Sequence, residues 1–166
     1  MKILLLDAQA CDVLHVQLAD LLLDAVACGA FSSIAFGLDS RAARCYWQDV
    51  RAAVAGGTRR LLAASHDGTL IGTVQLDLCQ RADGRRRADV QALMVHSRAR
   101  RRGIGGVLLR AAEAEARALG RDALRLAAER GSGAEALIHD LGYARIDGAA
   151  GAHVTYAKTL LMPEAA

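Results

Sequence analysis

Apolar residues along the first third of the chain recur every three or four positions, which is the spacing of amphipathic helices. One such run extends over residues 11–28 and is followed by Gly29, a residue type that commonly ends helices. A second run begins at the capping pair Asp39-Ser40 and stops at Gly56-Gly57. We therefore predict two helices here, preceded by a short apolar strand at residues 2–6.

The rest of the chain alternates between extended and helical patterns. Two strand-like segments, at residues 60–65 and 69–78, flank an Asp67-Gly68 pair, which is a strong hairpin signal. A third strand is predicted at 89–95. The remaining elements are predicted at residues 103–119 (helix), 123–127 (strand), 134–141 (helix), 143–146 (strand) and 154–160 (strand).

The predicted order is strand, two helices, three strands, helix, strand, helix and two strands. This order is typical of an α/β or α+β fold, in which a mixed sheet is flanked by helices. A length of 166 residues suits a single domain, which we expect over residues 1–162, with a short tail at 163–166.

Composition narrows the function classes. Hydrophobic residues make up 53% and charged residues 23%, so the chain is expected to be globular rather than disordered. Aromatic residues make up only 4%, which disfavours a nucleic-acid platform built from stacking rings. The apolar start of the chain is too short for a signal peptide or a membrane span. Neither a membrane nor a nucleic acid is expected as a partner.

Positive charge is unevenly distributed, although the formal net charge is only +3. Lys2 and Lys158 are the only lysines, and arginines gather at 85–87 and 98–102. Guanidinium groups make forked contacts to phosphate, so this clustering indicates an anionic partner. A solvated surface is the alternative, and for residues 85–87 the two interpretations have even weight.

The four cysteines show no CxxC pair and no zinc-like spacing with the histidines, so no metal is expected. We interpret Cys11, Cys28, Cys45 and Cys79 as small buried residues of a reducing cytoplasm. A cytoplasmic location is therefore expected.

The sequence from Leu93 to Leu109 has the most informative motif. A strand ends, a basic loop follows, and a helix begins with glycines at 103, 105 and 106. Glycine weakens a helix by about 1 kcal/mol, so three of them need a reason. Close approach of a ligand to the backbone is one reason, because a helix N-terminus with bare amides favours an anion. Tight packing of the helix on the sheet is the alternative. The loop lacks the Lys-Ser or Lys-Thr pair of a Walker A motif.

This motif resembles the (Gln/Arg)-x-x-Gly-x-(Gly/Ala) signature of the GNAT family of N-acetyltransferases. The resemblance implies a mostly antiparallel sheet and a loop whose amides bind the pyrophosphate of acetyl-CoA. The cofactor-binding residues that it implies are Arg100, Arg101, Arg102, Gly103, Ile104, Gly105 and Gly106. It also implies that Leu93, Met94 and Val95 lie in a bulged strand along the pantetheine arm.

Within the family, the chain is most similar to the tabtoxin-resistance-protein group, which implies a small-molecule amine as substrate. Four positions depart from the family. Arg101 replaces a usual glycine, and Ser97 replaces a frequent proline. Ile138 and Gly131 replace a tyrosine, the usual proton donor, and an asparagine that contacts pantetheine.

Asp89 is the candidate general base, because it matches a family position that often holds glutamate. Strict alternation would place it on the same strand face as Gln91, Leu93 and Val95. An ordinary ion pair with Arg87 or Arg102 is an equally weighted alternative.

His139 is a candidate proton donor in place of Ile138, although its side chain points about 100° away on a helix. A solvent-facing or capping role is the alternative. The expected function is therefore acetyl-CoA-dependent N-acetylation of a small-molecule amine by a monomer or homodimer. A weakened acyl-CoA-binding or regulatory protein and an RNA-associated module remain as alternatives.

Overall fold

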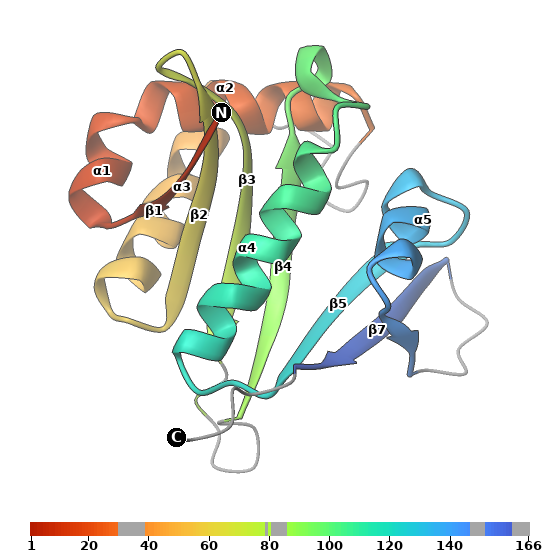
Figure 1. The fold of residues 1–166 in the computed structure, drawn as a ribbon. Helices are drawn as coiled ribbons and strands as arrows, with labels where there is room; N and C mark the ends of the chain where they lie inside the picture. The colour runs from red at the N-terminus through yellow and green to blue at the C-terminus, as the bar shows by residue number, and fades with distance from the viewer. Residues whose placement is uncertain (30–38, 79, 81–85, 147–151, 161–166) are drawn as a thin grey trace.

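A computed structural model describes residues 1–29, 39–78, 80, 86–146 and 152–160. Its core is a twisted seven-stranded sheet in the order β1-β2-β3-β4-β5-β7-β6 (Figure 1). Every neighbouring pair of strands is antiparallel except β4 and β5, which are parallel. The strands are β1 (Lys2–Leu6), β2 (Arg59–His66), β3 (Thr69–Leu78), β4 (Arg87–Val95), β5 (Ala123–Glu129), β6 (Ala144–Arg145) and β7 (His153–Thr159).

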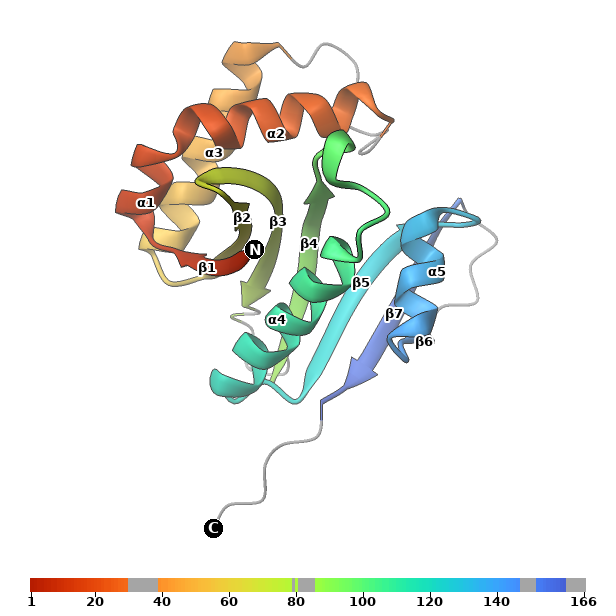
Figure 2. The same cartoon turned by 45° about the horizontal axis from the view of Figure 1, so that its top comes forward.

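Helices cover the two faces of the sheet unequally, as Figures 1 and 2 show. The helices are α1 (Ala8–Val13), α2 (His15–Ala27), α3 (Ser40–Ala55), α4 (Ile104–Ala118) and α5 (Gly133–Asp140). The first three cover one face of β1–β4, and α4 and α5 lie on the other face. The predicted fold class and element order are confirmed. No helix of the described part is both long and apolar enough to cross a membrane.

The helix predicted over residues 11–28 is two helices, which meet at Leu14. The break has a local cause, because the His15 imidazole hydrogen-bonds the Asp12 carbonyl oxygen at 2.8 Å. A side chain that binds a nearby carbonyl competes with the helical hydrogen bond that the same carbonyl would otherwise accept. Asp7, which precedes the pair, accepts from the Ala10 amide at 2.7 Å and caps α1.

Two apolar cores lie on opposite sides of the sheet. The first joins α1, α2 and α3 to the sheet through residues such as Leu18, Trp47 and Met94. The second lies under α4 and α5 and includes Leu108 and Ile138. The β2–β3 hairpin fits the Asp-Gly prediction, since Asp67 (φ 47°) and Gly68 (φ 78°) both have positive φ.

The cysteine prediction is wrong at two positions. Cys11 is buried, but Cys28 and Cys45 are exposed. Cys28 caps the C-terminus of α2, and Cys45 lies on the outer face of α3, since Ala43 and Trp47 on either side of it are buried. Cys79 and the predicted tail at 163–166 lie outside the described residues.

A buried charge pair fastens the end of α5 to α4. Lys158 Nζ on β7 donates to Glu113 Oε1 on α4 and to the Leu141 carbonyl oxygen, both at 2.8 Å. The same ammonium lies 5.3 Å from the centroid of the Tyr143 ring. The Glu113 side chain is 6% exposed, and Arg117 approaches it to 3.4 Å. Burial, followed by the nearby Glu113 carboxylate, raises the pKa of the Tyr143 hydroxyl.

We predict that Lys158→Met destabilises the protein by about 3 kcal/mol, because it leaves the buried Glu113 carboxylate with only the Arg117 contact. A matched double variant, Glu113→Leu with Lys158→Met, should recover most of this loss, since neither charge is then buried. Urea unfolding at neutral pH measures both. A double variant as unstable as the single one would show that the pair contributes packing rather than charge compensation.

Gly72 on β3 lies directly under the start of α4. A Cβ at this position would lie 2.8 Å from the Met94 carbonyl oxygen and 3.0 Å from Leu108 Cδ1. We predict that Gly72→Ala lowers the free energy of unfolding by about 1–3 kcal/mol, because this contact cannot relax without moving backbone. Gly133→Ala is the control: its Cβ meets nothing within 4 Å, and it should be neutral or slightly stabilising in urea unfolding.

Candidate functional site

The turn that enters α4 leaves its first amides without helical partners. The first intrahelical bond is donated by Val107 to the Gly103 carbonyl oxygen, at 3.1 Å. The amides of Ile104, Gly105 and Gly106 precede it and lack a carbonyl one turn earlier in the helix. The helix N-cap, Gly103, has φ 74° and provides no side-chain cap. The positive end of the helix therefore presents unpaired donors, which is the arrangement that binds an anion.

Two residues in this turn have left-handed backbone conformations. Besides Gly103, Arg101 has φ 61°. Left-handed conformations favour glycine, which gives a physical reason for the glycine that the family usually has at position 101. The chain keeps an arginine there, and therefore a cationic side chain in the same turn as the unpaired amides.

The arginines of the loop are exposed. Arg100 donates from Nε to the Val95 carbonyl oxygen at 3.2 Å. No ion pair joins Arg101 or Arg102 to a carboxylate within the described parts of the chain. Their guanidinium groups can therefore turn towards an anion at the helix N-terminus.

Close packing explains one of the three glycines, Gly105. A Cβ on Gly105 would lie 3.1 Å from Leu137 Cδ2 of α5, and one on Gly106 would lie 3.5 Å from Leu137 Cδ1. The packing alternative is thus supported at Gly105, whereas the distance at Gly106 is ordinary van der Waals contact, and neither excludes anion binding. A bare backbone lets α5 pack against the first turn and leaves the amides of that turn uncovered by their own side chains.

A bulge interrupts β4 within the segment predicted to contact pantetheine. Thr73 of β3 pairs with Met94, but Gln75, two residues on, pairs with Gln91, so β4 has an extra residue between them. Ala92 has φ 49° at this point. Backbone groups of the bulged stretch are therefore left out of the ladder with β3.

The bulge makes the predicted strand face of Asp89 wrong. Leu93 and Val95 belong to the core under α4, as does Val90, although strict alternation would separate them. The extra residue at Ala92 shifts the alternation by one position. Asp89 therefore faces the α1–α3 side of the sheet, whereas Leu93 and Val95 face the α4 side.

Asp89 lies where β4 and β5 separate. The two strands pair only from Arg87 to Asp89, against Ala123 to Arg125, and diverge beyond this point (Figure 1). The Asp89 carboxylate approaches Arg87 Nε at 3.5 Å and Arg125 Nε at 3.6 Å. The predicted contact with Arg87 is confirmed, but the second arginine is Arg125 rather than Arg102. Sequence gave no indication of Arg125, because its proximity depends on the parallel pairing.

Both ion-pair contacts reach the same carboxylate oxygen, Oδ1. Asp89 Oδ1 is buried and has no hydrogen-bond partner within the described structure. The side chain as a whole remains 34% exposed. The carboxylate lies beside the strand divergence, where it can accept a proton through water.

A row of polar residues beside Asp89 was missed by the sequence analysis. Arg59 donates to Gln75 at 3.0 Å and to Asp77 at 2.8 Å, and Gln75 donates to the Tyr46 hydroxyl at 2.8 Å. Asp77 is the β3 partner of Asp89 in the ladder. The row spans β2, β3 and α3, so only the folded chain brings these residues together.

Ile138 and His139 lie in different surroundings on α5. Ile138 is 2% exposed and is part of the core under α4 and α5. His139 is exposed, and its ring packs edge-on against Tyr156 with 5.2 Å between centroids. Gly131, the second departure from the family, donates its amide to Glu135 Oε2 at 2.5 Å.

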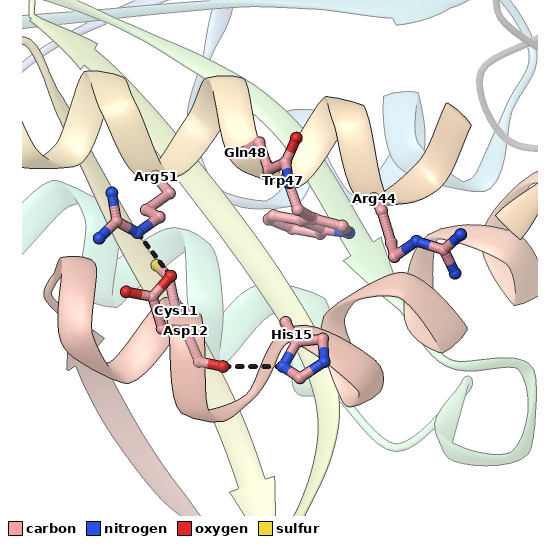
Figure 3. Close-up of a pocket in the computed structure, with 7 residues that line it drawn as sticks. All are labelled: Cys11, Asp12, His15, Arg44, Trp47, Gln48 and Arg51. Carbon is pink, nitrogen blue, oxygen red and sulfur yellow. Dashed lines mark hydrogen bonds and ion pairs between the residues drawn. The ribbon is translucent and has the colours of Figure 1, made fainter. Parts of the chain in front are cut away.

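A separate pocket of about 170 Å³ lies between the start of α2 and α3 (Figure 3). Arg51 pairs with Asp12 at 2.5 Å across one end, and Arg44 extends away from the other. This pocket contains none of the predicted site residues. Within the described residues, no group of three or more His, Cys, Asp or Glu side chains could hold a metal ion.

Comparisons with solved structures show the same fold. An aminoglycoside 6′-acetyltransferase type Ii superposes with a TM-score of 0.76 at 20% identity, over 98% of this chain and 99% of the other. A putative acetyltransferase from Salmonella typhimurium with acetyl-CoA gives 0.71 at 18% identity, over 100% and 97%. An N-acetyltransferase from Thermoplasma acidophilum in complex with coenzyme A gives 0.67 at 18% identity, over 96% and 99%.

The family itself is shown by sequence. Residues 30–143, more than two thirds of the chain, match the model of the acetyltransferase (GNAT) family. The match includes β4, α5 and the turn into α4, so it covers the site described above. The likeness to the tabtoxin-resistance-protein group stays a prediction. This chain belongs to the acetyltransferase (GNAT) family.

Proposed function

We propose that this protein transfers the acetyl group of acetyl-CoA to a primary amine of a small molecule. The observation that supports this most directly is the turn into α4, which holds three unpaired amides and the exposed residues Arg101 and Arg102. A diphosphate fits this donor set, because it offers several anionic oxygens to amides and forked cations at once. Solved structures of the same fold hold acetyl-CoA or coenzyme A.

The pantetheine arm would then follow β4 towards the bulge. Beyond Asp89 the edge of β4 that turns towards β5 has no strand partner in the described chain, so its backbone groups can bind an extended arm. The arm would pass Val95, Met94 and Leu93 in that order. A backbone amide near Met94 or Val95 would stabilise the oxyanion that forms when the thioester carbonyl is attacked.

Asp89 would act as the general base from the face of the sheet that α1, α2 and α3 cover. An amine with a pKa of about 10.4 costs roughly 4–5 kcal/mol to deprotonate at neutral pH. The amine nitrogen attacks the thioester carbon, its proton passes to the Asp89 carboxylate through water, and the carbon–sulfur bond then breaks. Asp89 lies five residues before Met94, about 16 Å along the strand, a distance that a chain of several waters would bridge.

The thiolate of coenzyme A would leave without a tyrosine acid. The chain has three tyrosines. Tyr143 is buried and Tyr156 donates to Glu135. Tyr46 accepts from Gln75 and keeps its own proton, but it lies on α3, across the sheet from α4. A thiol has a pKa of about 8.5, so its anion can depart without a strong proton donor. The reaction is therefore expected to be slower than in relatives with the usual tyrosine, by about 10²–10⁴-fold.

Two resemblances support a small-molecule acceptor. The tabtoxin-resistance-protein group acts on a small toxin, and two of the solved structures with this fold are aminoglycoside 6′-acetyltransferases. Toxins, antibiotics and metabolites with a primary amine are therefore the first acceptors to test.

The cofactor site is tested by placing a carboxylate in it. We predict that Gly103→Glu weakens coenzyme A binding by at least about tenfold, because the new charge repels the diphosphate. Gly120→Glu is the control: Gly120 ends α4, has φ 70°, and a Cβ there meets nothing within 4 Å, as at Gly103. Calorimetric titration of coenzyme A compares the two variants. Equal affinity in both, or no binding by the unsubstituted protein, would rule out the proposed site.

The general base is tested with Asp89→Asn. We predict a fall in kcat/KM for the amine of about 10²-fold and loss of the acidic limb of the pH–rate profile, with the KM for acetyl-CoA little changed. Asp77→Asn, which alters the neighbouring carboxylate of the ladder, should keep that limb. Thiol release with a panel of amines measures the rates. An unchanged profile in Asp89→Asn would leave this carboxylate with only an ion-pair role.

The burial of Ile138 favours one alternative function. A regulatory protein that binds acyl-CoA without efficient turnover would not need the tyrosine that Ile138 replaces. Tight coenzyme A binding with no thiol release for any amine in the panel would select this alternative.

A further inference from the structure

Asp24, near the end of α2, binds the loop that follows β4. Its Oδ2 accepts from the Ser97 amide at 2.7 Å, and its Oδ1 accepts from the Ser97 hydroxyl at 2.6 Å. The two residues are 73 positions apart in sequence. The Asp24 side chain is only 19% exposed, so both bonds form largely away from bulk water.

The local sequence does not favour an aspartate at this place. Asp24 lies in the last turn of α2, which ends at Ala27, where the negative end of the helix dipole disfavours a carboxylate. Groups in the loop after β4 offset this unfavourable interaction with the helix dipole. Burial raises the pKa of Asp24, but the Ser97 hydroxyl and amide, followed by His96 and Arg100, hold it below its usual range. The carboxylate is therefore ionised at neutral pH.

Ser97 is the first residue of the turn that leads to the proposed diphosphate site. The short helix Ser97–Ala99 follows β4 directly, and five residues later the chain enters α4. Ala99 is buried in the core under α4, which fixes the middle of this loop. The Ser97 contact fixes its beginning to a helix on the other side of the sheet; Figures 1 and 2 both show the end of α2 beside this turn.

The left-handed residues downstream make this anchor important. Arg101 and Gly103 occupy conformations with positive φ, so the path into α4 depends on a chain that is held at both ends. A proline at position 97, frequent in the family, would provide stiffness but neither hydrogen-bond donor. In this chain the hydrogen bonds from Ser97 to Asp24 hold the loop in place of that stiffness.

We propose that Asp24 is a positioning residue for the diphosphate of the acetyl donor: by holding Ser97, it fixes the loop that aims the amides and guanidiniums of the α4 turn. The proposal rests on the proposed function. Asp24 is not expected to touch the donor, so its effect should concern the diphosphate and not the pantetheine arm, which follows β4.

The test compares two probes, coenzyme A and pantetheine, which share the arm but differ in the diphosphate. In Asp24→Ala the Kd of coenzyme A should rise about tenfold, the order of one charge-assisted hydrogen bond, while the affinity for pantetheine changes by less than about twofold. Asp20→Ala, one turn earlier on the same helix and exposed, should alter neither. Calorimetry serves for coenzyme A and ligand-observed magnetic resonance for pantetheine.

Ser97→Ala provides a second route if Asp24→Ala does not fold, since Ser97 is exposed and the change removes only the hydroxyl bond. It should weaken coenzyme A binding in the same direction, and the double variant should be no weaker than Asp24→Ala alone. Equal weakening of both probes, or no change in coenzyme A affinity, would overturn the positioning role. If the unsubstituted protein binds both probes equally, the diphosphate site of the proposed function fails instead.

Discussion

The parting of β4 from β5 is the constraint on which the rest of the site depends. Three residue pairs join the two halves of the sheet, and beyond them the strands follow separate paths. Parallel neighbours normally continue their ladder, because unpaired backbone groups are costly when buried. Here the unpaired edge begins at Asp89 and runs towards the turn into α4. The bulge, the ion-paired carboxylate and the helix N-terminus follow one another along β4 and the turn after it.

The turn into α4 shows how one sequence feature meets two requirements. The glycine at 105 lets Leu137 of α5 approach the helix closely, and Gly106 beside it leaves the same surface bare. The same absence of side chains leaves the first-turn amides uncovered. Packing and ligand binding are therefore not competing explanations for these glycines, because both require a backbone that other atoms can reach. Gly103 has a different requirement, since its left-handed conformation is what turns the chain into the helix.

Features encoded by neighbouring residues could be predicted from sequence. The Asp67-Gly68 hairpin, the Asp39 cap of α3 and the glycine after α4 are each set by the conformational preferences of a few adjacent residues. The motif between β4 and α4 likewise combines a strand, a basic loop and glycines within one short segment. These signals were sufficient for the fold class and for the loop residues of the candidate site.

Features that depend on distant residues could not be predicted. Arg125 approaches Asp89 only because β4 and β5 are parallel neighbours, and Asp24 meets Ser97 only because α2 crosses the end of β4. The strand face of Asp89 was predicted wrongly for a related reason. Alternation holds only while a strand stays in step with its neighbour, and the bulge at Ala92 has no signature of its own in the sequence.

The bulge also determines how the strand would respond to a change in its length. Deletion of Ala92 would restore the two-residue repeat between Asp89 and Val95. Either the Asp89 carboxylate would then point into the apolar core beneath α4, or Leu93 and Val95 would point out of that core. A single-residue deletion here would therefore reverse the sheet face to which the side chains of half of β4 point. Substitutions at Ala92 would keep each side chain on its present face.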